Sequence, residues 1–121
     1  MRLVIVGSVK ARAKDTKPII REVIKRLKPD MVGSGEADGT DTHVKEVVEG
    51  EFKGKANYKG FPPETKSWNG WHGYKWRNLQ MVNWGTHFVR IASIRSGTYG
   101  SGFTVDQAEI LGKPVERFMV S

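Results

Sequence analysis

Cysteine is absent from this chain, and its absence removes several kinds of chemistry at once. Without thiols the protein forms no disulfides, holds no metal through thiolates and has no cysteine nucleophile. Disulfides are typical of secreted proteins, so we predict an intracellular, cytoplasmic location. The histidines are few and scattered, at positions 43, 72 and 87, so we predict neither a bound metal nor another cofactor.

Long apolar runs are missing as well. The apolar run at residues 3–6 is far shorter than the roughly 20 residues that span a bilayer, and no cleavage-site pattern follows it. We therefore expect no membrane contact and interpret this run as a buried strand. Internal repeats and low-complexity tracts are absent too, and 121 residues suit a single domain over 1–121.

Acidic residues are in the minority, because 20 Lys and Arg stand against 13 Asp and Glu, for a net charge of +7. A positive field favours partners that carry phosphate, such as nucleotides or nucleic acid. The alternative is a lysine-rich surface that only keeps the protein in solution. Composition alone leaves both open.

Apolar residues form an alternating series of short runs and helical stripes. Helices are predicted over residues 15–28, 41–49, 72–83 and 104–111. Strands are predicted at residues 3–6, 31–32, 56–61, 86–94 and 115–120. Such alternation predicts an α/β fold with a mostly parallel sheet of about five strands and helices on both faces.

Glycine is concentrated in the loops that follow the predicted strands. Gly7 follows the first strand, Gly33, Gly35 and Gly39 follow the second, and three glycines at 97, 100 and 102 follow the fourth. In a parallel sheet all these loops lie at the carboxyl edge, where open α/β sheets bind ligands. Helices that begin there offer free N–H groups to an anion. We predict a ligand crevice at this edge; the alternative is that the glycines only make tight turns.

Three segments resemble the SLOG superfamily, which joins the DNA-processing protein DprA with the LOG phosphoribohydrolases. Residues 33–44, "GSGEADGTDTHV", are similar to the family's S-G-x-A-x-G-x-D turn, and Arg77 and Asn78 in "KWRNLQM" match its R-N pair. Residues 100–115, "GSGFTVDQAEILGKPV", resemble a DprA stretch in which arginine stands where this chain has Lys113. The resemblance implies a Rossmann-like three-layer sandwich and a site for nucleotides or nucleotide-derived ligands.

The loop positions and the resemblance together give a set of predicted ligand-binding residues. These are Gly7, Ser8, Ser34, Gly35, Asp38, Gly39, Arg77, Asn78, Gly97, Thr98, Gly100, Ser101, Gly102 and Thr104. Arg77 is expected to hold a phosphate, or else to pair with Asp38 or Asp41. Asp41 is expected to cap the helix beginning beside it. Trp68 and Trp71 are either a lid over a base or packing residues.

Catalysis is less well supported than binding. LOG enzymes carry a glutamate that assists cleavage of the N-glycosidic bond, whereas this chain has the DprA-like Thr104 in the corresponding segment. Glu36 and Glu109 are the candidate catalytic carboxylates, and neither is well placed in the pattern. We predict binding of a nucleotide-like small molecule without turnover. The alternatives are single-stranded nucleic-acid binding similar to DprA and nucleotide N-glycosidase activity similar to LOG. The resemblance and the tryptophans also favour a homo-oligomer.

Overall fold

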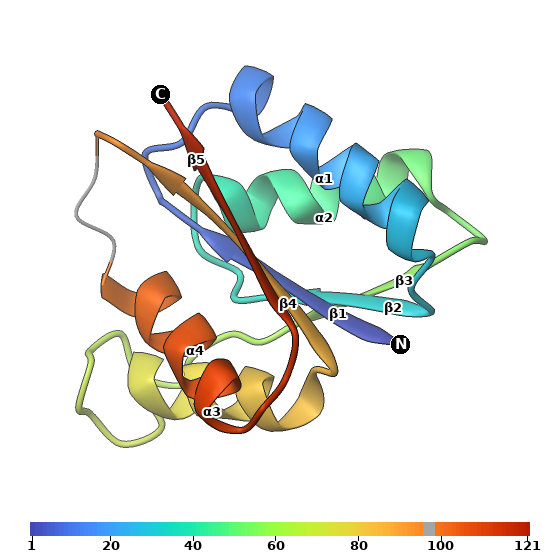
Figure 1. Cartoon of the computed structure of the whole chain (residues 1–121). Helices are drawn as coiled ribbons and strands as arrows, with labels where there is room; N and C mark the ends of the chain where they lie inside the picture. The colour runs from blue at the N-terminus through green and yellow to red at the C-terminus, as the bar shows by residue number, and fades with distance from the viewer. Residues whose placement is uncertain (96–98) are drawn as a thin grey trace.

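The computed structural model describes residues 1–95 and 99–121, in which strands and helices alternate without exception. The order is β1 (Arg2–Gly7), α1 (Ala13–Leu27), β2 (Met31–Ser34), α2 (Thr40–Glu51), β3 (Asn57–Gly60), α3 (Tyr74–Trp84), β4 (His87–Ser93), α4 (Tyr99–Ile110) and β5 (Val115–Val120) (Figure 1). None of the helices in the described ranges combines the length and the apolar character that crossing a membrane requires.

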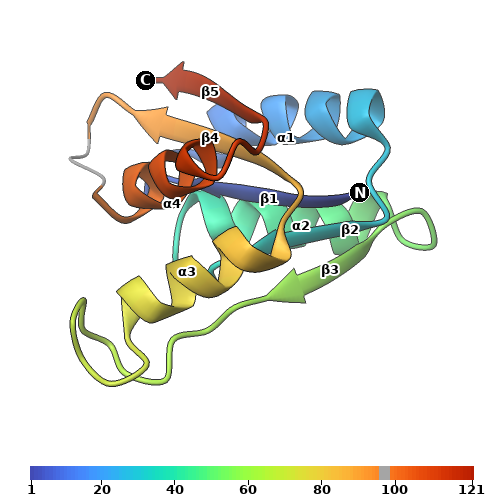
Figure 2. The same ribbon diagram turned by 60° about the horizontal axis from the view of Figure 1, so that its bottom comes forward.

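The strands form one sheet in the order β3-β2-β1-β4-β5, and every pairing between them is parallel. Two helices cover each face, with α1 and α2 on one side and α3 and α4 on the other (Figure 2). The predicted α/β fold, a Rossmann-like three-layer sandwich with helices on both faces, is therefore confirmed. In the described residues the sheet is wholly parallel, where the prediction was mostly parallel.

Each helix differs from its predicted range by at least one residue at either end, and two of these differences involve glycine. Helix α2 continues through Gly50 to Glu51, although Gly50 was expected to end it. Helix α4 begins at Tyr99, five residues before the predicted start at 104. The first turn of α4 contains Gly100 and Gly102, which have low intrinsic helix propensity, so packing on the sheet decides the helical conformation there.

Strand β1 is buried on both faces, which explains its uninterrupted apolar sequence. Leu3 and Ile5 belong to the core under α1 and α2, whereas Val4 and Val6 belong to the core under α3 and α4. Each fully buried aliphatic side chain of this kind stabilises the fold by about 1.5–3 kcal/mol. The alternation of these side chains makes β1 the central strand to which both helical layers are anchored.

The connections reverse direction beside β1. From β1 the chain proceeds through β2 to β3 at one edge, then returns through α3 to β4 on the other side of β1. The loops that leave β1 and β4 therefore run to opposite faces of the sheet. In open α/β sheets this reversal opens a crevice at the carboxyl ends of the two strands, which is where ligands bind.

Two glycines let the loops after β1 and β2 approach closely. A Cβ atom on Gly7 would lie 2.6 Å from Oγ1 of Thr40, the first residue of α2. Gly39 has φ 72°, and a Cβ atom there would lie 2.1 Å from the carbonyl oxygen of Val9. This approach lets the backbone N–H of Thr40 donate to the carbonyl oxygen of Ser8 over 3.2 Å, so the two loops form one wall.

Helix α3 is held at its carboxyl end by Lys113. The Lys113 ammonium donates to the carbonyl oxygens of Val82 (2.6 Å), Asn83 (3.4 Å) and Gly85 (2.9 Å). The last carbonyls of a helix have no intrahelical partners and favour a cation. Lys113 thus fixes the helix whose other end carries Arg77 and Asn78.

Candidate functional site

A pocket of about 570 Å³ lies at the carboxyl edge of the sheet, beyond the end of β1. Its walls come from the loop after β1, the turn before α2, the loop before α3, helix α3, the residues after β4 and the first turns of α4. The lining residues are Val6, Gly7, Val9, Lys10, Ala37, Asp41, Trp68, Tyr74, Arg77, Asn78, Met81, Arg95, Gly100, Ser101 and Thr104.

The three motif segments meet at this pocket through hydrogen bonds. Arg77 is 7% exposed, and its Nη1 donates to the carbonyl oxygen of Gly35 and, over 3.1 Å, to that of Phe61. Its Nε donates to Oδ1 of Asn78 over 2.7 Å, and Nδ2 of Asn78 donates to the carbonyl oxygen of Gly100 over 3.3 Å. The R-N pair therefore joins the glycine-rich turn before α2 to the first turn of α4.

Arg77 is consequently a structural clamp as well as a pocket residue. Burial lowers the pKa of its guanidinium, while the nearby Asp41 and Tyr74 raise it. The carbonyl oxygens of Gly35 and Phe61 replace the water that would solvate this charge. A ligand phosphate at the pocket would meet a guanidinium already held in place by its own protein.

Asp41 is the buried carboxylate of the pocket, with 6% of its surface exposed. Oδ2 accepts a hydrogen bond from the backbone N–H of Ala37 over 3.3 Å. Burial raises the pKa of Asp41 to about 7, although Arg77 and the backbone amides of Ala37 and Gly35 act in the opposite direction. Burial outweighs these contacts because a charged carboxylate loses more hydration than they return.

The prediction that Asp41 caps α2 is wrong. The N-cap residue is Gly39, and no side chain makes a cap hydrogen bond to the helix. Asp41 lies in the first turn, and its carboxylate binds the amide of Ala37 in the preceding turn instead. The positive φ of Gly39 turns the chain so that Asp41 faces back into that turn.

Several predicted ligand-binding residues do line the pocket. These are Gly7, Arg77, Asn78, Gly100, Ser101 and Thr104. The hydroxyl of Thr104 donates to the carbonyl oxygen of Gly100 over 3.0 Å, and Oγ of Ser101 accepts from Nε of Arg90 over 3.0 Å. Both hydroxyls thus stabilise the start of α4.

Other predicted residues lie away from the pocket lining. These are Ser8, Ser34, Gly35, Asp38, Gly39 and Gly102. Oγ of Ser8 accepts the backbone N–H of Ser93 over 2.8 Å, and Oγ of Ser34 lies 2.6 Å from the hydroxyl of Tyr58. These serines tie strand ends together, while the exposed Asp38 lies at the surface of its turn. Gly97 and Thr98 lie outside the described residues.

The two candidate catalytic carboxylates also lie away from the pocket lining. Glu36 is exposed and accepts a hydrogen bond from the hydroxyl of Tyr58 over 3.1 Å. Glu109 lies on the exposed side of α4 and pairs with Arg117. Neither position places a carboxylate against a sugar in the pocket.

The sequence reasoning missed Tyr74 and Met81, and it did not place Arg95 at the site. Tyr74, Arg77, Asn78 and Met81 follow the spacing of one helix face, and this pattern around the R-N pair could have identified them. Arg95 comes two residues after the end of β4, at the edge where a ligand was expected. Position relative to a strand end is therefore the signal that would have found it.

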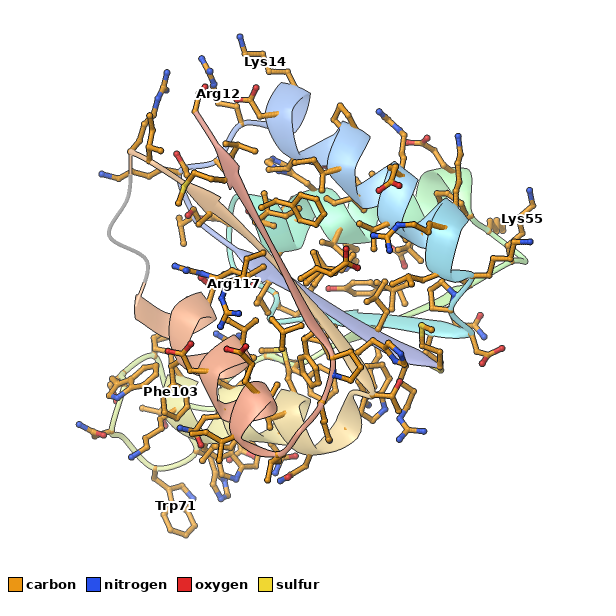
Figure 3. The ribbon with its side chains drawn as sticks, in the orientation of Figure 1. Arg12, Lys14, Lys55, Trp71, Phe103 and Arg117 are labelled. Carbon is orange, nitrogen blue, oxygen red and sulfur yellow. The ribbon has the colours of Figure 1, made fainter. Side chains whose placement is uncertain are left out.

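The two tryptophans of the proposed lid have different positions. Trp68 lines the pocket and packs edge-on against Phe103, with 5.2 Å between ring centroids. Trp71 does not line the pocket; it is 78% exposed and projects away from the molecule (Figure 3). His72 stacks between Trp71 and Trp76, at 4.4 Å and 4.2 Å.

The site thus combines basic side chains with aromatic walls. Lys10, Arg77 and Arg95 supply positive charge, while Trp68 and Tyr74 supply flat apolar surface. In the part of the chain that the structure describes, no group of three acidic or histidine side chains is arranged to hold a metal. Comparison of the chain with family models, curated proteins and solved structures gave no match. The site is therefore interpreted from its own geometry.

Proposed function

We propose that this protein binds a nucleotide or nucleotide-derived ligand in the pocket at the carboxyl edge, without turning it over. The observation that carries the proposal is the pocket's position beside the ends of β1 and β4, where the direction of the connections reverses. Its volume of about 570 Å³ falls in the usual range for small-molecule sites, roughly 300–1,000 Å³.

The lining supports a ligand with an anionic part and a planar part. Lys10 and Arg95 stand at the mouth as exposed cations, and Ser101 and Gly100 belong to the first turn of α4, a 12-residue helix. A phosphate at this end would gain from both the side-chain charges and the helix dipole. Trp68 and Tyr74 offer rings on which a base could stack.

Membership of the SLOG superfamily is part of the same proposal. Its support is that the resembling segments are in direct contact, since Arg77 binds the carbonyl of Gly35 and Asn78 binds that of Gly100. The cytoplasmic location expected from the cysteine-free composition stays a prediction.

Calorimetry with nucleoside monophosphates, ADP-ribose and cyclic dinucleotides tests the binding proposal. We expect at least one class to bind, and we expect Lys10→Ala to weaken that binding about tenfold through loss of one charge-assisted contact. Lys14→Ala is the matched control, because Lys14 lies in the same basic segment but outside the pocket lining (Figure 3). No heat with any ligand, or equal effects of the two variants, refutes the proposal.

We propose that no turnover occurs because Asp41, the one carboxylate that lines the pocket in the described residues, is already held by the protein. Glycoside cleavage needs a carboxylate free to act on the sugar. Oδ1 of Asp41 is covered by protein, and Oδ2 is bound to the amide of Ala37. Incubation with nucleoside monophosphates should therefore release no free base. If free base is released by wild type and not by Asp41→Asn, the N-glycosidase alternative holds instead.

Single-stranded nucleic-acid binding is the second candidate, and the exposed Trp71 favours it. The stack of Trp71, His72 and Trp76 ends in an indole face on which a base could continue the stacking. The exposed Lys66 and Lys75 flank this segment and could meet phosphates. This function predicts oligonucleotide affinity that falls steeply with salt and is reduced in Trp71→Ala. Affinity that is absent or independent of salt removes it.

A further inference from the structure

The two edges of the sheet are strands β3 and β5 (Figure 2), and they are protected to different degrees. Edge strand β3 has four residues, Asn57–Gly60, and carries the exposed Lys59. Edge strand β5 has six residues, Val115–Val120, with neither lysine nor proline among them. Short length, charged side chains and proline are the usual devices that stop an edge strand from pairing with another chain. β5 is the longer edge and has no proline, and its charged Glu116 and Arg117 are engaged in ion pairs within the chain.

On its outer side β5 presents backbone groups that pair with no other strand in the described part of the chain. The N–H of Phe88 donates to the carbonyl of Pro114 and that of Ile94 donates to the carbonyl of Val120, each over 3.0 Å. Backbone groups of alternate residues in a strand point to opposite sides. The N–H and C=O groups of residues 115, 117 and 119 therefore point away from β4, and no described strand lies on that side of β5.

The side chains around this edge are unusually apolar for a surface. Met119 is 66% exposed, and Ile94, the residue that follows β4, is 75% exposed. Phe118 and Val120 pack against the core under α1 and α2 but stay only partly buried. The edge therefore combines free hydrogen-bonding groups with uncovered hydrophobic surface, and a partner strand would satisfy both.

We propose that β5 pairs with β5 of a second copy of this chain in antiparallel orientation, joining two sheets into one. A two-fold axis lets the same segment serve on both sides. If Phe118 faces its counterpart across the axis, Glu116 faces Val120 and Arg117 faces Met119. This register opposes no like charges, and it brings two aromatic rings together on the α1 side of the joined sheet.

The neighbouring register, with the axis at Arg117, is less favourable. It would place two guanidinium groups opposite each other, and like charges directly opposite destabilise a strand pair. In its own chain Arg117 is bound to Asp106, over 3.0 Å, and to Glu109 on α4. Those contacts hold the Arg117 side chain on the α4 side (Figure 3), whereas Phe118 packs against the core under α1 and α2.

A proline substitution tests the backbone pairing. Because the N–H of Met119 points away from β4, Met119→Pro removes an outward donor while the pairing between β4 and β5 is kept. Met119→Ile is the matched control, because it keeps the N–H and an apolar side chain. By light scattering across a dilution series, we expect wild type and Met119→Ile to reach twice the 13.6 kDa mass of the chain and Met119→Pro to stay at it. A wild-type monomer at every concentration, or equal dimerisation of both variants, overturns the proposal.

Cysteine crosslinking tests the register and needs no proline. The chain contains no cysteine, so a single introduced thiol can form a disulfide only with its counterpart in a second copy. In the proposed register Phe118→Cys places two Cβ atoms at a separation suited to a disulfide, whereas Arg117→Cys does not. We expect mild oxidation to crosslink Phe118→Cys several times faster than Arg117→Cys. No crosslinking in Phe118→Cys, or faster crosslinking in Arg117→Cys, overturns the proposal.

Discussion

Replacing Asp41 with asparagine should stabilise this protein, and the gain should depend on pH. Burial raises the pKa of Asp41 from its ordinary value of 3.8 to about 7 in the folded chain. Between these two values the folded state binds more protons than the unfolded state, so the stability that this group confers is lost as pH rises. The loss begins near pH 4 and is complete above pH 7.

The size of this change in stability follows from the difference between the unfolded and folded pKa values of Asp41. This difference of roughly three pH units corresponds to about 4 kcal/mol at about 1.36 kcal/mol per unit. An asparagine has nearly the same shape, and its side-chain oxygen can still accept the N–H of Ala37. Asparagine does not ionise, so the variant keeps its stability as pH rises. The difference in free energy of unfolding between Asp41→Asn and wild type should therefore be about 3 kcal/mol larger at pH 8 than at pH 5. For a domain of this size this corresponds to about 10 °C in melting temperature.

Urea unfolding of both proteins from pH 5 to pH 8 measures this difference directly. Other titrating groups, such as His43, whose pKa burial lowers, are present in both proteins and cancel in the comparison. Asp38→Asn is the control. It removes the same charge from the turn just before α2, but the Asp38 side chain is exposed, so stability should stay within about 0.5 kcal/mol of wild type. A stability gap between Asp41→Asn and wild type that stays constant over this pH range would refute the buried-carboxylate reasoning.

Two further predictions concern the elements that position the site. Lys113→Met should lower the free energy of unfolding by about 2 kcal/mol, because the last carbonyls of α3 lose their cation. Lys113→Arg keeps the positive charge and should lower it less. Thermal melts of wild type and the two variants measure this difference. Gly39→Ala should lower the free energy of unfolding by about 3 kcal/mol or more, because the new Cβ atom clashes with the Val9 carbonyl and φ is positive there. Gly54→Ala should lower it by only about 1 kcal/mol, because Gly54 has φ 81° but open space around it. Equal denaturation midpoints for the two alanine variants would contradict the importance of that close approach.

Most of the fold could be predicted from the sequence because its signals are local. The continuous apolar run of residues 3–6 indicates a strand buried on both faces, and the stripe of Ile20, Val23 and Ile24 indicates a helix with one buried face. Regular alternation of such segments leaves few possible connections once crossovers are right-handed. Boundaries were harder: Gly100 and Gly102 lie within α4, where sheet packing outweighs their low helix propensity.

Less of the site could be predicted, because side-chain direction depends on distant backbone. The sequence placed Arg77, Gly35 and Gly100 at one edge, and the fold joins Gly35 to Arg77 and Gly100 to the neighbouring Asn78. The sequence could not show that the Arg77 guanidinium donates to the carbonyl oxygens of Gly35 and Phe61, because both residues lie far from Arg77 in the chain. Nor could it show that Asp41 turns away from its own helix towards Ala37.

What the sequence determined by itself is therefore the order of strands and helices and the edge at which the glycine-rich loops gather. Hydrophobic periodicity and turn chemistry are properties of neighbouring residues, and they suffice for that. The tertiary structure alone decided which polar groups are buried, which are already bound within the protein and which face the pocket. The cost of burying a charge depends on every group packed around it, and those groups come from parts of the chain that only folding brings together.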